Sequence, residues 1–130
     1  MNWSEYLVLA KALAAAKPST PAHLRSAISR AYYAALHEGK RYIGDKHPEI
    51  PIPKHKLHEF VWNTLQTLDV LQAQDAGATG ASLCVTRNDA DYKKNAIVTD
   101  RSVGDAIKEA DRIYALLHAA RKTPQIAKSK

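Results

Sequence analysis

Residues 21–43 read "PAHLRSAISRAYYAALHEGKRYI", and the apolar residues among them recur with the period of an α-helix. At about 100° per residue, small and apolar side chains occupy one arc of this helix. The arc comprises Leu24, Ala27, Ile28, Ala31, Tyr32, Ala34 and Ala35. Thr20 is a suitable N-cap, and Pro21 is well tolerated at the first helical position. The pattern predicts a long helix that turns this arc toward a helical core.

The opposite side of the same helix is polar and carries Ser26, Ser29, Arg30, Tyr33 and His37. One interpretation is an ordinary solvated face, on which tyrosine rings cover the helix edges and Arg30 pairs with a nearby acid. The other interpretation is a groove in which Arg30, Tyr33 and His37 face a phosphate group. Periodicity alone leaves both interpretations open.

The segments on either side of this helix are also predicted to be helical. The segment 3–17, "WSEYLVLAKALAAAK", is rich in strong helix formers and stops before a proline. Residues 44–53, "GDKHPEIPIP", contain three prolines and are predicted to form a loop. A third helix is expected to start near Lys54 or His55, with one continuous apolar stripe. The stripe consists of Leu57, Val61, Leu65, Leu68 and Leu71.

The last third of the chain adds two more predicted helices. Residues 72–82, "QAQDAGATGAS", contain two glycines, which fit a turn or a weak first section of the fourth helix, expected at about 81–94. Thr99 or Asp100 is expected to cap a fifth helix that ends near Arg121. Its apolar stripe is Val103, Ala106, Ile107, Ala110, Ile113, Tyr114 and Leu117. The sequence therefore predicts an all-α bundle of four to five helices, connected up and down.

Length and charge indicate one domain with a basic tail. A chain of 130 residues suits a single domain, expected over residues 1–121. Four of the six excess positive charges lie from Arg121 onward, so residues 122–130 are predicted to be a disordered basic tail. The basic character favours a nucleic-acid partner only weakly, because so much of it lies in this tail.

Several classes of site and location are disfavoured. The lone cysteine, Cys84, excludes internal disulfides and paired-cysteine zinc sites. His55 and His58 are three residues apart, but no further ligand pattern completes a metal site, and no glycine-rich phosphate loop or nucleophile elbow is present. We therefore expect neither a metal nor a cofactor. No stretch approaches the roughly 18 apolar residues of a membrane span, and no signal peptide is evident, so a cytoplasmic protein without a membrane partner is expected.

A second polar constellation lies in the fourth predicted helix, at "TRNDADYKK", residues 86–94. Arg87 and Asp91 are four residues apart and can form an ion pair on one helix face. Asn88 and Tyr92 share a neighbouring arc. A weak surface ion pair is the plain interpretation. A site that combines guanidinium, amide, carboxylate and phenol groups is the alternative.

Three segments together resemble the HEPN superfamily of small prokaryotic helical proteins. They are "RSAISRAYYAALHEGKRY", "HKLHEFVWNTL" and "TRNDADYK", and the resemblance extends over roughly residues 5–120. It implies a helical bundle that forms a homodimer around a shared polar cleft. It also implies action on RNA in toxin–antitoxin or phage-defence systems, often as a metal-independent endoribonuclease that uses an R-x4-6-H motif. Other members are non-catalytic modules that bind RNA, nucleotide or a partner such as a nucleotidyltransferase.

The chain departs from the HEPN motif at its histidine. Arg87 and Asn88 match the arginine and the polar residue that follows it, but positions 92–94 read Tyr-Lys-Lys. His37 is one candidate substitute base, and Tyr92 is a poorer one, because a free phenol has a pKa of about 10. The predicted cleft consists of Arg30, Tyr33, His37, Arg87, Asn88, Asp91 and Tyr92, with Arg87 and His37 as candidate catalytic residues.

Three functional hypotheses stay open on the sequence. In the first, the chain is an RNA-directed toxin that is countered by an antitoxin. In the second, it is a non-catalytic module that binds RNA, nucleotide or a nucleotidyltransferase. In the third, it is a purely structural helical dimer. A fourth possibility for the polar residues is that Asp91 simply holds Arg87 or Arg30 inside the bundle.

Overall fold

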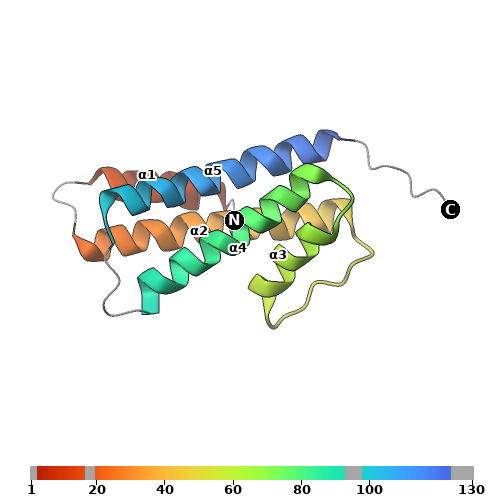
Figure 1. Cartoon of the computed structure of the whole chain (residues 1–130), viewed down its shortest axis with the longest axis horizontal. Helices are drawn as coiled ribbons and strands as arrows, with labels where there is room; N and C mark the ends of the chain where they lie inside the picture. Colours follow the sequence, from red (N-terminus) through yellow and green to blue (C-terminus); the bar gives the residue numbers. More distant parts are fainter. Residues whose placement is uncertain (1–2, 17–19, 93–97, 124–130) are drawn as a thin grey trace.

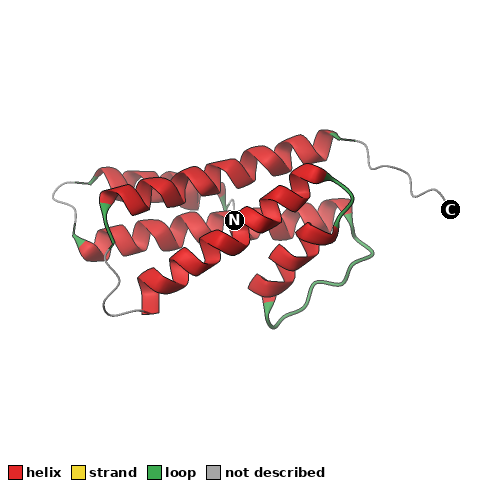
Figure 2. Ribbon diagram, in the orientation of Figure 1, coloured by secondary structure: helices red, strands yellow, loops and turns green. Residues whose placement is uncertain are grey.

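The computed structural model describes residues 3–16, 20–92 and 98–123, and these residues form five α-helices and no β-strand (Figures 1 and 2). The helices are α1 (Ser4–Ala15), α2 (Pro21–Lys46), α3 (Leu57–Thr67), α4 (Leu71–Tyr92) and α5 (Asp100–Lys122). In Figure 1, α1 and α4 run in one direction, and α2 and α5 run in the opposite one. Buried side chains from all five helices form one hydrophobic cluster. The predicted all-α bundle is confirmed.

Helix α2 begins as predicted and is central to the bundle. Thr20 is its N-cap, with Oγ1 accepting a hydrogen bond from the backbone N–H of His23 at 3.2 Å, and Pro21 occupies the first turn. All seven side chains of the predicted core arc are buried. Helix α2 packs against each of the other four helices. Its buried arc therefore organises the whole core.

Helix α2 continues to Lys46, three residues beyond the predicted end at Ile43. The single Gly44 does not break it, since one glycine costs a helix only about 1 kcal/mol. The backbone N–H of His47 still donates to the carbonyl of Ile43 at 2.8 Å. His47 then leaves the helical conformation because Pro48 follows it.

The prediction of one continuous stripe from Leu57 to Leu71 is wrong. Helix α3 begins at Leu57, later than expected, and ends at Thr67. Leu68 is extended and buried, whereas Leu71 opens α4 and is 67% exposed. The apolar spacing continued through a chain reversal that contains neither glycine nor proline, so the sequence pattern did not reveal the break.

The glycine-rich segment before Ala81 is helical, and α4 starts about ten residues earlier than the predicted boundary. Gly77 and Gly80 are buried against α3 rather than placed in a turn. A Cβ atom at Gly80 would overlap the Trp62 indole, and one at Gly77 would lie 2.7 Å from the Trp62 carbonyl oxygen. The two glycines therefore allow α3 and α4 to approach closely.

Helix α5 matches its prediction closely. Thr99 is the N-cap and forms a reciprocal capping box with Ser102. The predicted stripe faces the core, with Ile107 and Tyr114 partly buried and its other members fully buried. The helix ends at Lys122, one residue beyond the predicted Arg121.

The predicted ends of the first and fourth helices, at Lys17 and Lys94, lie outside the described residues, as does the tail after Thr123. Lys122 itself is the last residue of α5. Among the described helices, none combines the length and apolar character that crossing a bilayer requires.

Candidate functional site

Arg87 of α4 is the centre of a polar cluster against α2. Its Nη2 donates a hydrogen bond to Oη of Tyr33 at 2.9 Å, and its Nε lies 2.8 Å from Oδ2 of Asp91. Its Nη1 donates to Oδ1 of Asn88 at 3.2 Å. The Arg87 side chain is only 12% exposed and that of Asp91 is 23% exposed. The predicted pairing of Arg87 with Asp91 is therefore present, in a more buried setting than a surface ion pair.

Three tyrosine rings surround the Arg87 guanidinium. Its central carbon lies 5.0 Å from the ring centroid of Tyr33, 5.6 Å from that of Tyr92 and 5.9 Å from that of Tyr32. Such distances allow cation–π attraction. We call Tyr32, Tyr33, Arg87, Asp91 and Tyr92 the arginine–tyrosine cluster. It draws on adjacent positions of α2 and on the last turns of α4.

The buried hydroxyl of Tyr32 links this cluster to α3. Nε1 of Trp62 donates a hydrogen bond to Oη of Tyr32 at 3.1 Å, and Nδ1 of His58 lies 2.7 Å from the same oxygen. Burial raises the pKa of the Tyr32 phenol far above its usual range, so the phenol keeps its proton. Burial, and then the charge of Arg87, lower the pKa of His58. His58 is thus a neutral imidazole at pH 7 beside a fixed cation.

His37 is a second histidine next to the Tyr33 ring. Its ring stacks on that of Trp3, with centroids 3.6 Å apart and planes 8° from parallel, and its centroid is 6.5 Å from that of Tyr33. Burial is the main cause that lowers the pKa of His37, followed by the positive charge of Lys40. The His58 ring meets the Tyr33 ring edge-on at 5.8 Å. Two neutral imidazoles therefore lie next to the Tyr33 ring.

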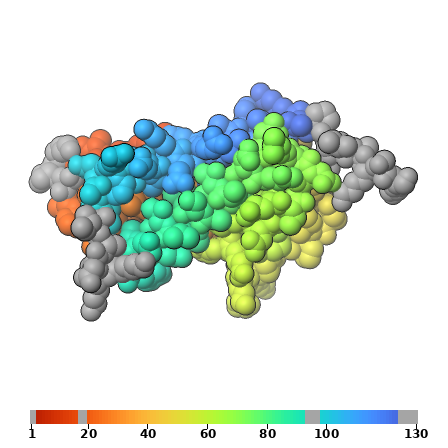
Figure 3. Space-filling model, in the orientation of Figure 1, coloured from red at the N-terminus to blue at the C-terminus, as the bar shows by residue number. Residues whose placement is uncertain are grey.

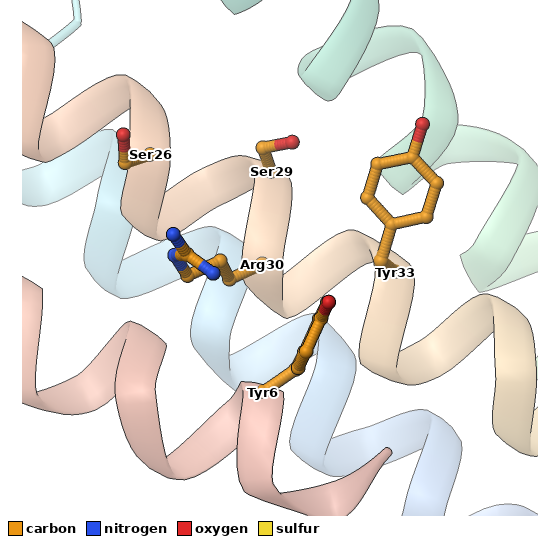
Figure 4. Close-up of a pocket in the computed structure, with 5 residues that line it drawn as sticks. All are labelled: Tyr6, Ser26, Ser29, Arg30 and Tyr33. Carbon is orange, nitrogen blue, oxygen red and sulfur yellow. The ribbon is translucent and has the colours of Figure 1, made fainter. Parts of the chain in front are cut away.

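Arg30 does not join the arginine–tyrosine cluster. Its guanidinium carbon lies 5.8 Å from the ring centroid of Tyr6, which belongs to α1. Tyr6, Arg30 and Tyr33 line a cavity together with Ser26 and Ser29 (Figure 4). The single predicted cleft is therefore two sites that share Tyr33.

Sequence reasoning missed four contributors to these sites. Tyr32 was predicted as core, and it is buried, but its hydroxyl also belongs to the polar network. The sequence marks His58 only as a possible metal ligand beside His55. Trp3 and Tyr6 are not part of any polar pattern in the sequence. Their roles depend on the packing of α1 against α2, which the sequence does not show. The adjacent aromatic residues in "AYYAALH" were the available signal.

The geometry allows phosphate and proton chemistry. Arg87 supplies a fixed cation, and the two neutral imidazoles can accept a proton. Within the described residues, no three histidine, cysteine, aspartate or glutamate side chains gather closely enough to hold a metal ion. Comparisons with protein-family models, with curated proteins and with solved structures find no match to this chain.

Proposed function

We propose that this chain is a HEPN-type protein that binds or acts on RNA through the arginine–tyrosine cluster. The observation that carries the proposal is the fixed Arg87 guanidinium, with the neutral imidazoles of His58 and His37 both next to the Tyr33 ring. The proposed setting is the cytoplasm, in a toxin–antitoxin or phage-defence type system.

The same residues support RNA cleavage without a metal ion. In such a reaction a base takes the proton of the ribose 2′-hydroxyl, and a cation stabilises the charge that develops on the phosphate. Arg87 is suited to the second task, since cluster contacts hold its guanidinium in place. His58 and His37 are the two candidate bases that replace the missing motif histidine. His58 has the closer electrostatic coupling to Arg87.

A second candidate is a non-catalytic module that binds a nucleotide or a nucleotidyltransferase. The observation that favours it is that all three nitrogens of Arg87 already contact groups of the same chain, Asp91, Asn88 and Tyr33. A guanidinium that already contacts a carboxylate, an amide and a phenol of its own chain has fewer donors left for the phosphate of a substrate. Here the cluster would act as a rigid binding surface.

A homodimer is part of the proposal, and α4 offers the face for it. Leu71, Ala78, Val85 and Tyr92 follow one another at seven-residue spacing, and all four are exposed. Leu71, Val85 and Tyr92 are 60–73% exposed, which is unusual for large apolar side chains. Helix α4 lies along the face of the molecule seen in Figure 3. A stripe of this spacing suits contact with the same helix of a second copy.

Induced expression in a bacterial host separates the two candidates. If the chain is an endoribonuclease, expression degrades cellular RNA and arrests growth, and His58→Ala abolishes both effects, with His37→Ala tested in parallel. His55→Ala, which changes an exposed histidine three residues away, serves as the matched control and keeps them. Intact RNA on expression of the folded wild-type protein would contradict the catalytic candidate and favour the binding module.

A further inference from the structure

A cavity of about 210 Å³ opens between α1 and α2, beside the arginine–tyrosine cluster. Its lining consists of Tyr6, Ser26, Ser29, Arg30 and Tyr33. Figure 4 shows the hydroxyls of Tyr6 and Ser29 in the space between the Arg30 guanidinium and the Tyr33 ring. The lining residues therefore carry one guanidinium and four hydroxyls, and none of them carries a carboxylate. The Tyr33 hydroxyl is directed toward α4 (Figure 4), where it accepts the hydrogen bond from Arg87.

Arg30 differs from the comparable arginines in its lack of an anion. Arg30, Arg87 and Arg121 each have a buried side-chain nitrogen without a hydrogen-bond partner. Arg87 nevertheless lies 2.8 Å from a carboxylate oxygen of Asp91, and Arg121 hydrogen-bonds to Asp45 at 2.9 Å. Among the residues that the structure describes, Arg30 has no such carboxylate, and its buried atom is Nε. Partial burial of a cation is costly unless an anion accompanies it.

The chemistry of the lining selects the anion. A guanidinium with nearby hydroxyl donors matches the oxygens of a phosphate group, which accept several charge-assisted hydrogen bonds. The cavity is smaller than the roughly 300 Å³ at which pockets for whole drug-sized ligands begin. It therefore has room for a phosphate group and not for a complete nucleotide.

We propose that this cavity, the Arg30 pocket, binds a phosphate group of RNA, either a terminal phosphate or a phosphodiester of the backbone. Tyr33 lines the pocket and also accepts the hydrogen bond from Arg87, so a strand seated at Arg30 passes next to the arginine–tyrosine cluster. The identification of RNA as the carrier rests on the proposed function, whereas the phosphate site rests on the pocket itself.

The test measures inorganic phosphate by calorimetry, and a short RNA by fluorescence anisotropy at low salt, with and without a 5′-phosphate. Arg30→Gln is expected to weaken both phosphate and RNA about tenfold or more, because it removes charged hydrogen bonds. Arg25→Gln, the same change on α2 outside the pocket, is the matched control and leaves both affinities near the wild-type values. Tighter binding of the 5′-phosphorylated RNA would assign the pocket to a terminal phosphate, and equal binding to the backbone.

Phosphate affinity of Arg30→Gln equal to that of Arg25→Gln would overturn the pocket, and so would the absence of phosphate binding to the wild type. If Arg30→Gln does not fold, Ser29→Ala removes one hydroxyl with little effect on packing, and unchanged phosphate affinity in that variant also overturns the pocket. Phosphate binding that depends on Arg30, without RNA binding, would retain the pocket and refute the proposed function. RNA binding that does not change in Arg30→Gln would overturn the pocket and retain the proposed function.

Discussion

At the scale of single residues, the site depends on neutral histidines held next to cations. His58 is half-buried, contacts the Tyr32 hydroxyl and feels the charge of Arg87. His37 is stacked on Trp3 and lies near Lys40 and His58. In both cases protonation would place a second positive charge in a partly desolvated site, so the folded state disfavours it.

This arrangement predicts that acid destabilises the fold through these histidines. In the unfolded chain an imidazole takes up its proton near pH 6.5, whereas in the folded state the pKa of His58 is lower. The unfolded state therefore binds more protons as the pH falls below about 6.5, and the free energy of unfolding decreases. Urea unfolding between pH 7 and pH 5 measures the slope.

We expect His58→Gln to reduce this slope, because glutamine can keep a hydrogen bond to Tyr32 without titrating. His55→Gln changes an exposed histidine and should leave the slope as in the wild type. Equal slopes in the wild type and in His58→Gln would contradict the account of His58.

At the scale of elements, the helices pack through small residues, and α3 and α4 show it best. Gly80 lies against the Trp62 indole, and the same indole donates a hydrogen bond to Tyr32 in the arginine–tyrosine cluster. The close approach of α3 and α4 thus positions the Trp62 indole that donates to the Tyr32 hydroxyl. Gly104 of α5 is the opposite case, since a Cβ atom there would meet nothing within 4 Å.

Two glycine substitutions should therefore act in opposite directions. Gly80→Ala is expected to lower the free energy of unfolding by about 1 to 3 kcal/mol, because the added methyl overlaps a buried ring. Gly104→Ala is expected to raise it by up to about 1 kcal/mol through helix propensity. Chemical denaturation measures both. A stabilising Gly80→Ala would show that α3 and α4 are not packed at this distance.

Local patterns in the sequence predicted part of this fold, whereas contacts between distant residues were not predictable. The stripe of α5 and the core arc of α2 were predictable, because each is local and periodic. The role of Gly77 and Gly80 was not, because a glycine that marks a turn and one that admits a distant indole look the same in a sequence. The proximity of Arg87 and Asp91 was predictable, because it follows from their spacing on one helix. The separation of Arg30 from them was not predictable, because it depends on how α1 packs.

At the scale of the whole molecule, two surfaces lie close together. The arginine–tyrosine cluster occupies the end of α4 that also carries Tyr92, the last exposed residue of the apolar stripe. A second copy that covers the stripe with its own α4 in the parallel direction would bring the two clusters near each other. This is the shared cleft that the resemblance to HEPN proteins implies.

The dimer is tested by a charge on the stripe. We expect the wild type to sediment as a dimer at micromolar concentration and Val85→Glu to sediment as a monomer, since a carboxylate in an apolar contact is costly. Val8→Glu places the same charge at a similarly exposed valine on α1, and this variant should remain dimeric. A monomeric wild type, or a dimeric Val85→Glu, would refute α4 as the interface.

In the proposed function Arg87 contacts RNA, and a low-salt fluorescence-anisotropy titration of RNA with three variants tests this contact. Arg87→Gln removes the cation, Asp91→Asn removes its carboxylate partner but keeps the cation, and Arg112→Gln is the charge-matched control on the exposed side of α5. Thermal unfolding establishes the folded fraction of each variant. We predict that Arg87→Gln weakens RNA binding about tenfold or more, that Arg112→Gln changes it little, and that Asp91→Asn retains or strengthens it. No RNA binding by the folded wild type, or equal RNA affinities of Arg87→Gln and Arg112→Gln, would show that Arg87 does not contact RNA.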